Sequence, residues 1–238
     1  MDLVISGYGR MGHEVEKIAI DRNHNIIAVI DNKEDWNNKL KIIKSADAVV
    51  DFSFPETALD VFKKCFDIGV PLVTGTTGWY DKIEEVKKLC TRSNASFFYA
   101  PNFSIGVNIF FETNRKLAKM ISAVGGYQPS MEEIHHIHKL DSPSGTAIKL
   151  AEDTIKEFEE IDSWKNDPTN NKNELSILSK REGEITGTHI LKYDSEVDEI
   201  KISHTAKNRR GFALGAVVAA EFLSGKKGFF TMSDLLKV

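Results

Sequence analysis

Residues 133–147 hold the chain's densest group of side chains that can bind an anion and transfer a proton. Three histidines and a lysine fall within five positions: His135, His136, His138 and Lys139. Ser144-Gly145-Thr146 follows, and apolar residues then recur at helical spacing, so Ser144 is expected to cap a helix. The N–H groups of a helix start attract carboxylates, and imidazole and ammonium groups transfer protons near neutral pH. The segment therefore predicts a site for an organic acid.

Three other interpretations of these residues stay open at this point. The His and Lys side chains can form a solvated surface, and Ser144 can be an ordinary cap without a ligand. The histidines can also bind zinc, although neighbours on a strand point to opposite faces, so that only His136 and His138 would share one. No Cys-x-x-Cys or His-Glu-x-x-His pattern accompanies them. We therefore predict no metal site.

Length and composition indicate an ordinary globular protein. The chain has 238 residues, of which 41% are hydrophobic and 28% charged, and its net charge is −4. The length suits one large or two modest domains, and the charge gives no support for a nucleic-acid surface. Cys65 and Cys90 lie in amphipathic runs and are expected to be buried thiols. Because we see no leader pattern and no apolar run that would span a bilayer, we expect a cytoplasmic protein without a membrane segment.

The N-terminal residues have the pattern of a dinucleotide-binding unit. A short strand leads into Gly7-Tyr8-Gly9-Arg10-Met11-Gly12, followed by an amphipathic helix, a strand at 26–30 and Asp31. Gly7 permits a tight turn, Gly9 lets backbone N–H groups approach a pyrophosphate, and Gly12 lets helix and strand pack closely. This order of elements predicts a site for the adenosine half of a dinucleotide.

Two side chains after the second strand bear on which nucleotide binds. The carboxylate of Asp31 can accept hydrogen bonds from the ribose hydroxyls, which favours NADH. The ammonium group of Lys33 can instead pair with the 2′-phosphate of NADPH. The residues alone leave NADPH and NADH both open as the cofactor.

Strand patterns at 46–53, 70–74 and 96–100 alternate with helix patterns and extend this unit. Such alternation predicts parallel βαβ units. Gly75-Thr76-Thr77-Gly78 follows one of these strands, at the edge where open α/β sheets bind ligands. A plain turn is the alternative for this loop.

The second half of the chain has a different pattern. A helix is expected at 109–121, a strand at 128–138, a helix from Gly145 to about Ile161 and an exposed polar loop at 162–173. Three strand-like runs without helices between them, at 175–179, 183–193 and 199–205, predict an antiparallel meander. An open sheet face of this kind needs covering, which suggests subunit contacts. The fold class is α/β, with a Rossmann-type parallel sheet domain and an α+β domain whose open sheet is mostly antiparallel.

These motifs resemble the 4-hydroxy-tetrahydrodipicolinate reductase family, also called dihydrodipicolinate reductases, almost from end to end. The most specific motif is His-His-x-x-Lys-x-Asp-x-Pro-Ser-Gly-Thr-Ala at 135–147. The others are Gly-Tyr-Gly-Arg-Met-Gly, Asp-Phe-Ser, Gly-Thr-Thr-Gly, Ala-Pro-Asn-Phe-Ser-Ile-Gly-Val-Asn, Arg-Glu-Gly-Glu-Ile-Thr-Gly-Thr-His and Ser-His-Thr-Ala-Lys-Asn-Arg.

The resemblance implies roles for individual residues. It makes His135 a proton donor and acceptor, Lys139 a second proton donor, and places His136, Ser144, Gly145 and Thr146 at the substrate. It implies that residues 7–12 and Asp31 hold the adenosine end of the cofactor. The residues implied at the nicotinamide end are Gly75, Thr76, Thr77, Ala100, Pro101, Asn102 and Phe103.

The resemblance also implies an organisation and a reaction. We expect a dinucleotide-binding domain at 1–103 and 209–238, a substrate and oligomerisation domain at 104–208, and a homotetramer. Reduced nicotinamide would transfer hydride to a cyclic dicarboxylate bearing an imine, in diaminopimelate and lysine biosynthesis. The chain departs from many members at Asn32, where they have Arg, and in a Gly loop shorter by one residue.

Three rival functions can be separated from this one. Another Rossmann-type amino-acid or semialdehyde dehydrogenase would need a different segment in place of 135–146. A dinucleotide-sensing regulator would need a DNA-binding module or a basic face, and neither is visible in the sequence. A zinc protein would be revealed by metal analysis.

Overall fold

The computed structural model describes residues 1–208 and 210–237, and the chain forms two compact units. The first unit comprises Met1–Ile105 and Arg210–Val238, and the second comprises Gly106–Arg209. From the sequence we predicted the first division after residue 103, two residues earlier than in the structure. We predicted the second division after residue 208, one residue earlier. Arg209, which ends the Ser203–Arg209 motif and begins the expected second segment of the first domain, lies outside the described residues, as does Val238.

The first unit is built on a parallel sheet with helices on both faces. Among the described residues its six strands run in the order β11-β5-β4-β3-β1-β2, and every ladder is parallel. The strands are β1 (Asp2–Ser6), β2 (Asn25–Ile30), β3 (Ala48–Asp51), β4 (Leu72–Thr74), β5 (Ser96–Tyr99) and β11 (Gly228–Phe230). The helices are α1 (Arg10–Asp21), α2 (Lys33–Asn38), α3 (Leu40–Ile43), α4 (Pro55–Ile68), α5 (Ile83–Arg92), α8 (Arg210–Leu223) and α9 (Met232–Leu236), with a 3₁₀ turn at Tyr80–Lys82.

Alternation along the buried strands divides the core of this unit in two. Leu3 and Ile5 pack with α1 and α8 on one face, whereas Val4 packs with Phe62 and Val86 of α4 and α5 on the other. A strand covered on both faces is apolar throughout, which explains the continuous hydrophobic runs in the sequence. Cys65 and Cys90 are free, buried thiols, as predicted.

Four short elements of this unit were not predicted. No structure was expected from the sequence at α2, α3, β11 or α9. Asn32 caps α2, because its side-chain oxygen accepts a hydrogen bond from the backbone N–H of Asp35 at 2.9 Å. β11 has three residues and takes its place by pairing with β5, so its position depends on a partner far away in the sequence.

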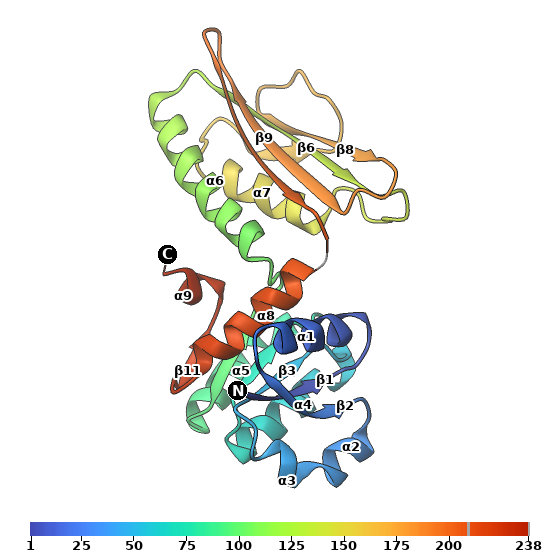
Figure 1. The fold of residues 1–238 in the computed structure, drawn as a ribbon. Coiled ribbons are helices and arrows are strands. Elements are labelled where there is room, and N and C mark those ends of the chain that lie inside the picture. The colour runs from blue at the N-terminus through green and yellow to red at the C-terminus, as the bar shows by residue number, and fades with distance from the viewer. Residues whose placement is uncertain (209, 238) are drawn as a thin grey trace. The chain divides into compact units, whose positions relative to one another are not determined.

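The second unit packs two helices on one face of a mixed sheet (Figure 1). The helices are α6 (Ile105–Val124) and α7 (Gly145–Ile155), and the strands are β6 (Gln128–His135), β7 (Ser163–Lys165), β8 (Glu174–Arg181), β9 (Gly187–Asp194) and β10 (Glu199–Ala206). The strand order is β10-β9-β6-β8-β7. The ladders β10–β9 and β9–β6 are antiparallel, and β6–β8 and β8–β7 are parallel.

The predicted meander of three strands was therefore wrong. β6 lies between β8 and β9, so only β9 and β10 form a hairpin. A period of two fixes which residues of a strand face the core, but not which strand lies beside it. The α+β character of the unit is confirmed, with a mixed sheet.

Three boundaries in this unit also differ from the sequence predictions. β6 ends at His135, so His136 and His138 lie in the turn after it and not on the strand. α7 ends at Ile155, and Phe158 packs into the core from beyond the helix. The expected loop at 162–173 contains β7, which pairs with β8 through Trp164 and Leu175. No helix among the described residues has the length and apolar character needed to cross a membrane.

Candidate functional site

In the first unit, the loop between β1 and α1 is shaped by two glycines. Gly7 has φ of +85°, and a Cβ on it would lie 2.4 Å from the carbonyl oxygen of Phe52. A Cβ on Gly12 would lie 2.4 Å from the carbonyl oxygen of Gly7. Side chains at these two positions are therefore excluded by contact with backbone, which agrees with the turn and close-packing roles predicted from the Gly-x-Gly-x-x-Gly spacing.

The start of α1 offers its backbone to a ligand. Gly9 is the N-cap, has no side chain to cap the helix, and the first turn contains no acidic residue. A Cβ on Gly9 would meet nothing within 4 Å. The helix start therefore combines open space with a partial positive charge, and these features fit a pyrophosphate.

Asp31 lies directly after β2 at the same edge of the sheet. Its Oδ1 accepts a hydrogen bond from the backbone N–H of Tyr8 at 3.0 Å, which links the acid to the glycine loop. Arg10, Met11 and Lys33 lie in the same region, in the first turns of α1 and α2. The structure thus brings the residues predicted at the adenosine end together in one part of the unit.

A buried acid, Asp51, organises the loop after β4. Its Oδ2 accepts hydrogen bonds from the hydroxyls of Thr74 and Thr76, both at 2.8 Å. Burial raises the pKa of this carboxyl group above its usual value. These bonds hold the segment Gly75-Thr76-Thr77 at the carboxyl end of the sheet, where Ala100 also joins through its N–H to the carbonyl oxygen of Thr74. The Asp-Phe-Ser motif was recognised in the sequence, but no role was predicted for Asp51 from it.

Ala100 and Phe103 are buried in this unit, whereas Pro101 is exposed. The N–H of Ser104 donates to the side-chain oxygen of Asn102 at 2.9 Å, which closes the turn that follows β5.

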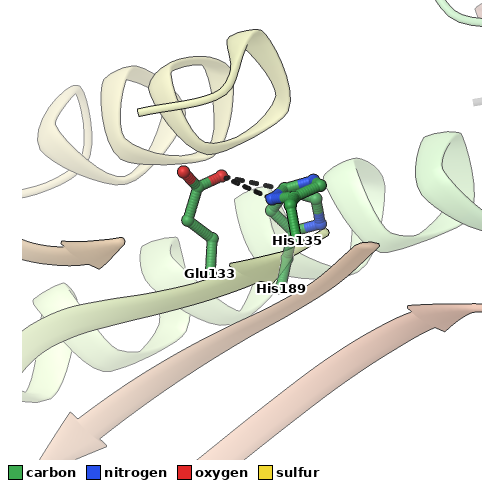
Figure 2. Close-up of side chains that lie close together, drawn as sticks. All are labelled: Glu133, His135 and His189. Atoms are coloured by element: carbon green, nitrogen blue, oxygen red, sulfur yellow. Dashed lines mark ion pairs between the residues drawn. The ribbon is translucent and has the colours of Figure 1, made fainter. Parts of the chain in front are cut away.

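In the second unit, a buried carboxylate and two imidazoles meet on the face of the sheet that α7 covers. Glu133 and His135 are two residues apart on β6 and point to the same side, and His189 reaches them from β9 (Figure 2). Oε2 of Glu133 lies 3.4 Å from Nδ1 of His135 and 3.6 Å from Nε2 of His189. The carboxylate is completely buried. With Ser144 and Arg181, we call these residues the Glu133 cluster.

The carboxylate of Glu133 is surrounded by donors. The backbone N–H of Ser144 donates to both of its oxygens, at 3.0 and 3.2 Å, and the guanidinium of Arg181 lies 3.4 Å from Oε1. Burial alone raises the pKa of Glu133, but hydrogen bonds from His189 and Ser144 outweigh it and hold this pKa well below its usual value. Glu133 is therefore ionised at neutral pH.

The imidazole of His135 is buried, although charged side chains lie close to it. Burial lowers its pKa to about 4, although the charge of Glu133 acts in the opposite direction. Its Nδ1 is buried and makes no hydrogen bond with the described residues, the nearest anionic atom being Oε2 of Glu133. The imidazole is consequently neutral near pH 7 in the protein alone.

Lys139 lies in the turn that follows β6. Its ammonium group is 2.7 Å from both carboxylate oxygens of Asp141. Arg181 holds this turn, because its guanidinium donates to the carbonyl oxygens of Lys139 and Asp141 at 3.2 and 2.5 Å. Arg181 thus connects the turn of Lys139 to the same buried carboxylate that His135 contacts directly.

The remaining predicted substrate residues lie around the start of α7. Ser144 caps the helix as predicted, since its Oγ accepts from the N–H of Ala147 at 3.2 Å, and Oγ also lies 3.1 Å from Nε2 of His189. Gly145 begins the helix with open space around its Cα, and Thr146 follows, half-buried. His136 lies in the turn with its Nδ1 buried and without a hydrogen-bond partner among the described residues.

Three residues of the cluster were not predicted from the sequence to have a role: Glu133, Arg181 and His189. Glu133 could have been found from its spacing, because residues 133 and 135 share a face of any strand. His189 and Arg181 belong to the quoted Arg-Glu-Gly-Glu-Ile-Thr-Gly-Thr-His motif, but only the folded sheet brings that motif to β6.

One group of side chains among the described residues has ligand atoms close enough to hold a metal ion, and of the three histidines considered from the sequence it contains only His135. One ligand atom each from Glu133, His135 and His189 lies within 4.8 Å of the others. The oxygens of Glu133 already accept from Ser144 and lie against Arg181, a fixed cation. A carboxylate whose oxygens are occupied in this way orients other groups, and it is poorly suited to bind a metal ion.

Comparison with known proteins gives a consistent answer over the whole chain. A family model described as dihydrodipicolinate reductase, N-terminus, matches residues 1–103, and one described as dihydrodipicolinate reductase, C-terminus, matches residues 106–236. A protein from Christiangramia forsetii named 4-hydroxy-tetrahydrodipicolinate reductase is 45% identical over 236 residues, covering 99% of this chain and 98% of the relative. A protein of the same name from Methanopyrus kandleri is 35% identical, covering 82% of this chain and 73% of the relative.

Solved structures agree on the fold. A dipicolinate-bound dihydrodipicolinate reductase from Paenisporosarcina sp. TG-14 has a TM-score of 0.83 at 21% identity, with 99% of each chain covered. An aspartate semialdehyde dehydrogenase from Vibrio cholerae has a TM-score of 0.52 at 13% identity, covering 93% of this chain and 97% of that one. At these identities the likeness concerns the fold alone. The two family models and the 45% identical relative carry the assignment, and the chain belongs to the dihydrodipicolinate reductase family.

Proposed function

We propose that this protein reduces 4-hydroxy-tetrahydrodipicolinate to tetrahydrodipicolinate with NAD(P)H, in diaminopimelate and lysine biosynthesis. The observation that carries the proposal is the position of His135. Its imidazole lies 3.4 Å from the buried carboxylate of Glu133, and the same carboxylate accepts a hydrogen bond from Ser144 at the start of α7. An imidazole beside an anion-binding helix start is suited to protonate a carboxylate-bearing substrate. Bound NAD(P)H supplies the hydride.

The first unit is proposed to hold the nucleotide. The glycine loop at 7–12 and the start of α1 would bind the pyrophosphate, and Asp31 would bind the adenosine ribose. Lys33 is the cation available to a 2′-phosphate. The segments 75–77 and 100–103, at the carboxyl edge of the sheet, would line the nicotinamide.

The second unit is proposed to hold a cyclic dicarboxylate. One carboxylate would accept hydrogen bonds from the backbone N–H groups of Gly145 and Thr146, with His136 beside it. The likeness to a reductase solved with dipicolinate, a flat ring with two carboxylates, supports this class of ligand. Ser144 contributes by capping α7 and by anchoring that turn to Glu133.

Proton transfer is assigned to His135 and Lys139. Two substrate carboxylates near His135 would raise the pKa of this imidazole from its low value in the protein alone, so that it takes up a proton when substrate binds. Lys139 would leave Asp141 to donate a proton or to pair with the substrate. Transfer from a positioned group accelerates a reaction by roughly 10²–10⁴-fold.

A coupled assay tests the proposal directly. Pyruvate and aspartate semialdehyde are supplied with the synthase that forms the substrate, and oxidation of NADH and of NADPH is followed separately by the loss of their absorbance. Synthase-dependent oxidation supports the proposal. Oxidation that needs only aspartate semialdehyde would favour a semialdehyde dehydrogenase, and no oxidation under either condition would contradict both.

We further propose a cytoplasmic homotetramer that associates through the second unit. The face of the sheet opposite α6 and α7 carries partly exposed apolar side chains, including Ile134, Leu178 and Ile190. Covering such a face by a second copy removes apolar area from water. Sedimentation of the full chain gives its mass in solution. A tetramer that Ile190→Lys dissociates supports this interface, and a monomeric native protein would contradict it.

A further inference from the structure

Glu133 is the member of the cluster that contacts each of the others. Its carboxylate is fully buried, and four groups from three other elements and its own strand converge on it: the N–H of Ser144, the guanidinium of Arg181, and the imidazoles of His135 and His189. A buried charge without partners is strongly unfavourable, so each of these groups contributes to keeping it ionised.

The chemistry of these partners fixes where the protons lie. The N–H of Ser144 and the guanidinium of Arg181 can only donate, so both oxygens of Glu133 act as acceptors. A ring nitrogen that faces an ionised carboxylate favours carrying a hydrogen. Nδ1 of His135 and Nε2 of His189 are the nitrogens that face Oε2 of Glu133. The two imidazoles therefore carry this hydrogen on opposite nitrogens, Nδ1 in His135 and Nε2 in His189.

We propose that Glu133 is the positioning residue of the proton-transfer site, holding His135 in the Nδ1–H tautomer and His189 in the Nε2–H tautomer. Nε2 of His135, on the other side of its ring, is then the nitrogen that exchanges a proton with the substrate. The inference rests on the proposed function for that last step, whereas the tautomers follow from the cluster alone.

The same carboxylate couples the imidazole to the anion site. Its bonds to the N–H of Ser144 fix the residue that caps α7, and Arg181 extends the contact to the carbonyl oxygens of Lys139 and Asp141. One buried group thus sets the tautomer of His135, the start of the helix and the turn that holds Lys139. Its removal is expected to affect turnover more than binding of the nucleotide.

The test compares Glu133→Gln with Glu132→Gln in the full chain. Glu132 is the neighbouring residue on the opposite face of β6, where its carboxylate pairs with Lys180 at 2.9 Å. The two variants therefore carry the same substitution on the same strand, but only Glu133→Gln changes the cluster. Glu133→Gln is expected to lower kcat by roughly 10²–10⁴-fold with the Kd for NADPH unchanged. Glu132→Gln should keep kcat within about twofold.

Two further readouts separate positioning from a merely structural role. Nitrogen-15 NMR of the wild-type protein should show His135 as Nδ1–H and His189 as Nε2–H, and Glu133→Gln should shift His135 toward Nε2–H. Because the charge of Glu133 raises the pKa of His135, and His135 must be protonated to donate, the Gln variant should also move the alkaline limb of the kcat profile to lower pH. Glu133→Asp, which keeps the carboxylate, should recover part of kcat.

Several results would overturn the inference. These are a wild-type His135 in the Nε2–H tautomer, a folded Glu133→Gln protein with native kcat, or a stoichiometric bound metal whose removal abolishes activity. If Glu133→Gln does not fold, the wild-type spectrum still decides the tautomers. If the wild-type protein does not reduce the substrate, the proposed function fails, and the tautomers are tested independently by the same spectrum.

Discussion

The glycine loop of the first unit offers a ligand its backbone, whereas the Glu133 cluster of the second unit offers side chains. The loop is continuous in sequence, from Gly7 to Gly12, and works because two Cβ atoms are missing. The cluster collects residues from β6, α7, β8 and β9, which the sheet and the helix cap bring to one buried carboxylate. The first kind of site depends on space and a helix dipole, and the second on charge, tautomer and burial.

This difference predicts that each region can be damaged without the other. Changes in the cluster should alter turnover and its pH dependence, and changes in the loop should alter nucleotide binding and local packing. The following substitutions test that separation, beginning with the largest expected effect.

Replacing the proton-transfer residues should have the largest effect. His135→Gln and Lys139→Ala are each expected to lower kcat by roughly 10²–10⁴-fold, because each removes a group that donates a proton. Nucleotide Kd, measured by fluorescence titration, should stay within about twofold. His138→Gln is the matched control, since the side chain of His138 is exposed and lies 3.1 Å from the carboxylate of Glu184. An equal loss of nucleotide affinity would contradict the assigned roles.

Acid should destabilise the cluster through His135. Burial lowers the pKa of this imidazole to about 4, from a usual value near 6.5. Between these values the unfolded chain binds a proton that the folded protein does not, so the free energy of unfolding falls as the pH falls. The loss from this group is at most about 3 kcal/mol. Glu133, whose pKa lies below its usual value, adds its own loss mainly below this window.

Denaturant unfolding at several pH values measures this slope. His135→Gln should reduce the dependence on pH between about 6.5 and 4, because it removes the titrating group. A variant with the same slope as the wild-type protein would show that another group is responsible.

Gly12→Ala should damage the loop without changing the chemistry. Its Cβ would lie 2.4 Å from the carbonyl oxygen of Gly7, so α1 must move away from β1, at a cost of about 1–3 kcal/mol of stability. Thermal unfolding and nucleotide titration should show both effects. The control is Gly211→Ala in α8, where the nearest atom would be 3.8 Å away. Equal behaviour of the two variants would remove the close-packing role from Gly12.

The preference between NADH and NADPH should show the smallest effect, and substitutions of Asp31 and Lys33 should change it in opposite directions. Asp31→Ala is expected to weaken NADH about tenfold more than NADPH, because it removes a charged acceptor for the ribose and a repulsion of the 2′-phosphate. Lys33→Ala should weaken NADPH more. The ratio of the two Kd values is the measurement, and a ratio unchanged in Asp31→Ala would exclude this residue from the ribose site.

Much of the first unit could be predicted because its signals are local. The glycine spacing, the apolar strands and the acid after β2 occur in the order in which the chain folds, and the structure brings them to one edge of the sheet. The short elements α2, α3, β11 and α9 were missed because segments of three to six residues carry little periodicity.

The second unit was predicted less completely because its signals are not local. The segment 135–146 was identified, and Ser144 caps α7 as expected. Alternation could not show that β6 separates β8 from β9, and so the meander was wrong. For the same reason His189 and Arg181 could not be placed beside Glu133 before the sheet was known.

The most direct test of the account is a crystal structure of the protein with NADH and pyridine-2,6-dicarboxylate. We predict a carboxylate of the ligand at the N–H groups of Gly145 and Thr146, with Nε2 of His135 directed at the ring and Nδ1 directed at Glu133. A ligand bound elsewhere, or an imidazole of His135 turned away from it, would contradict the account.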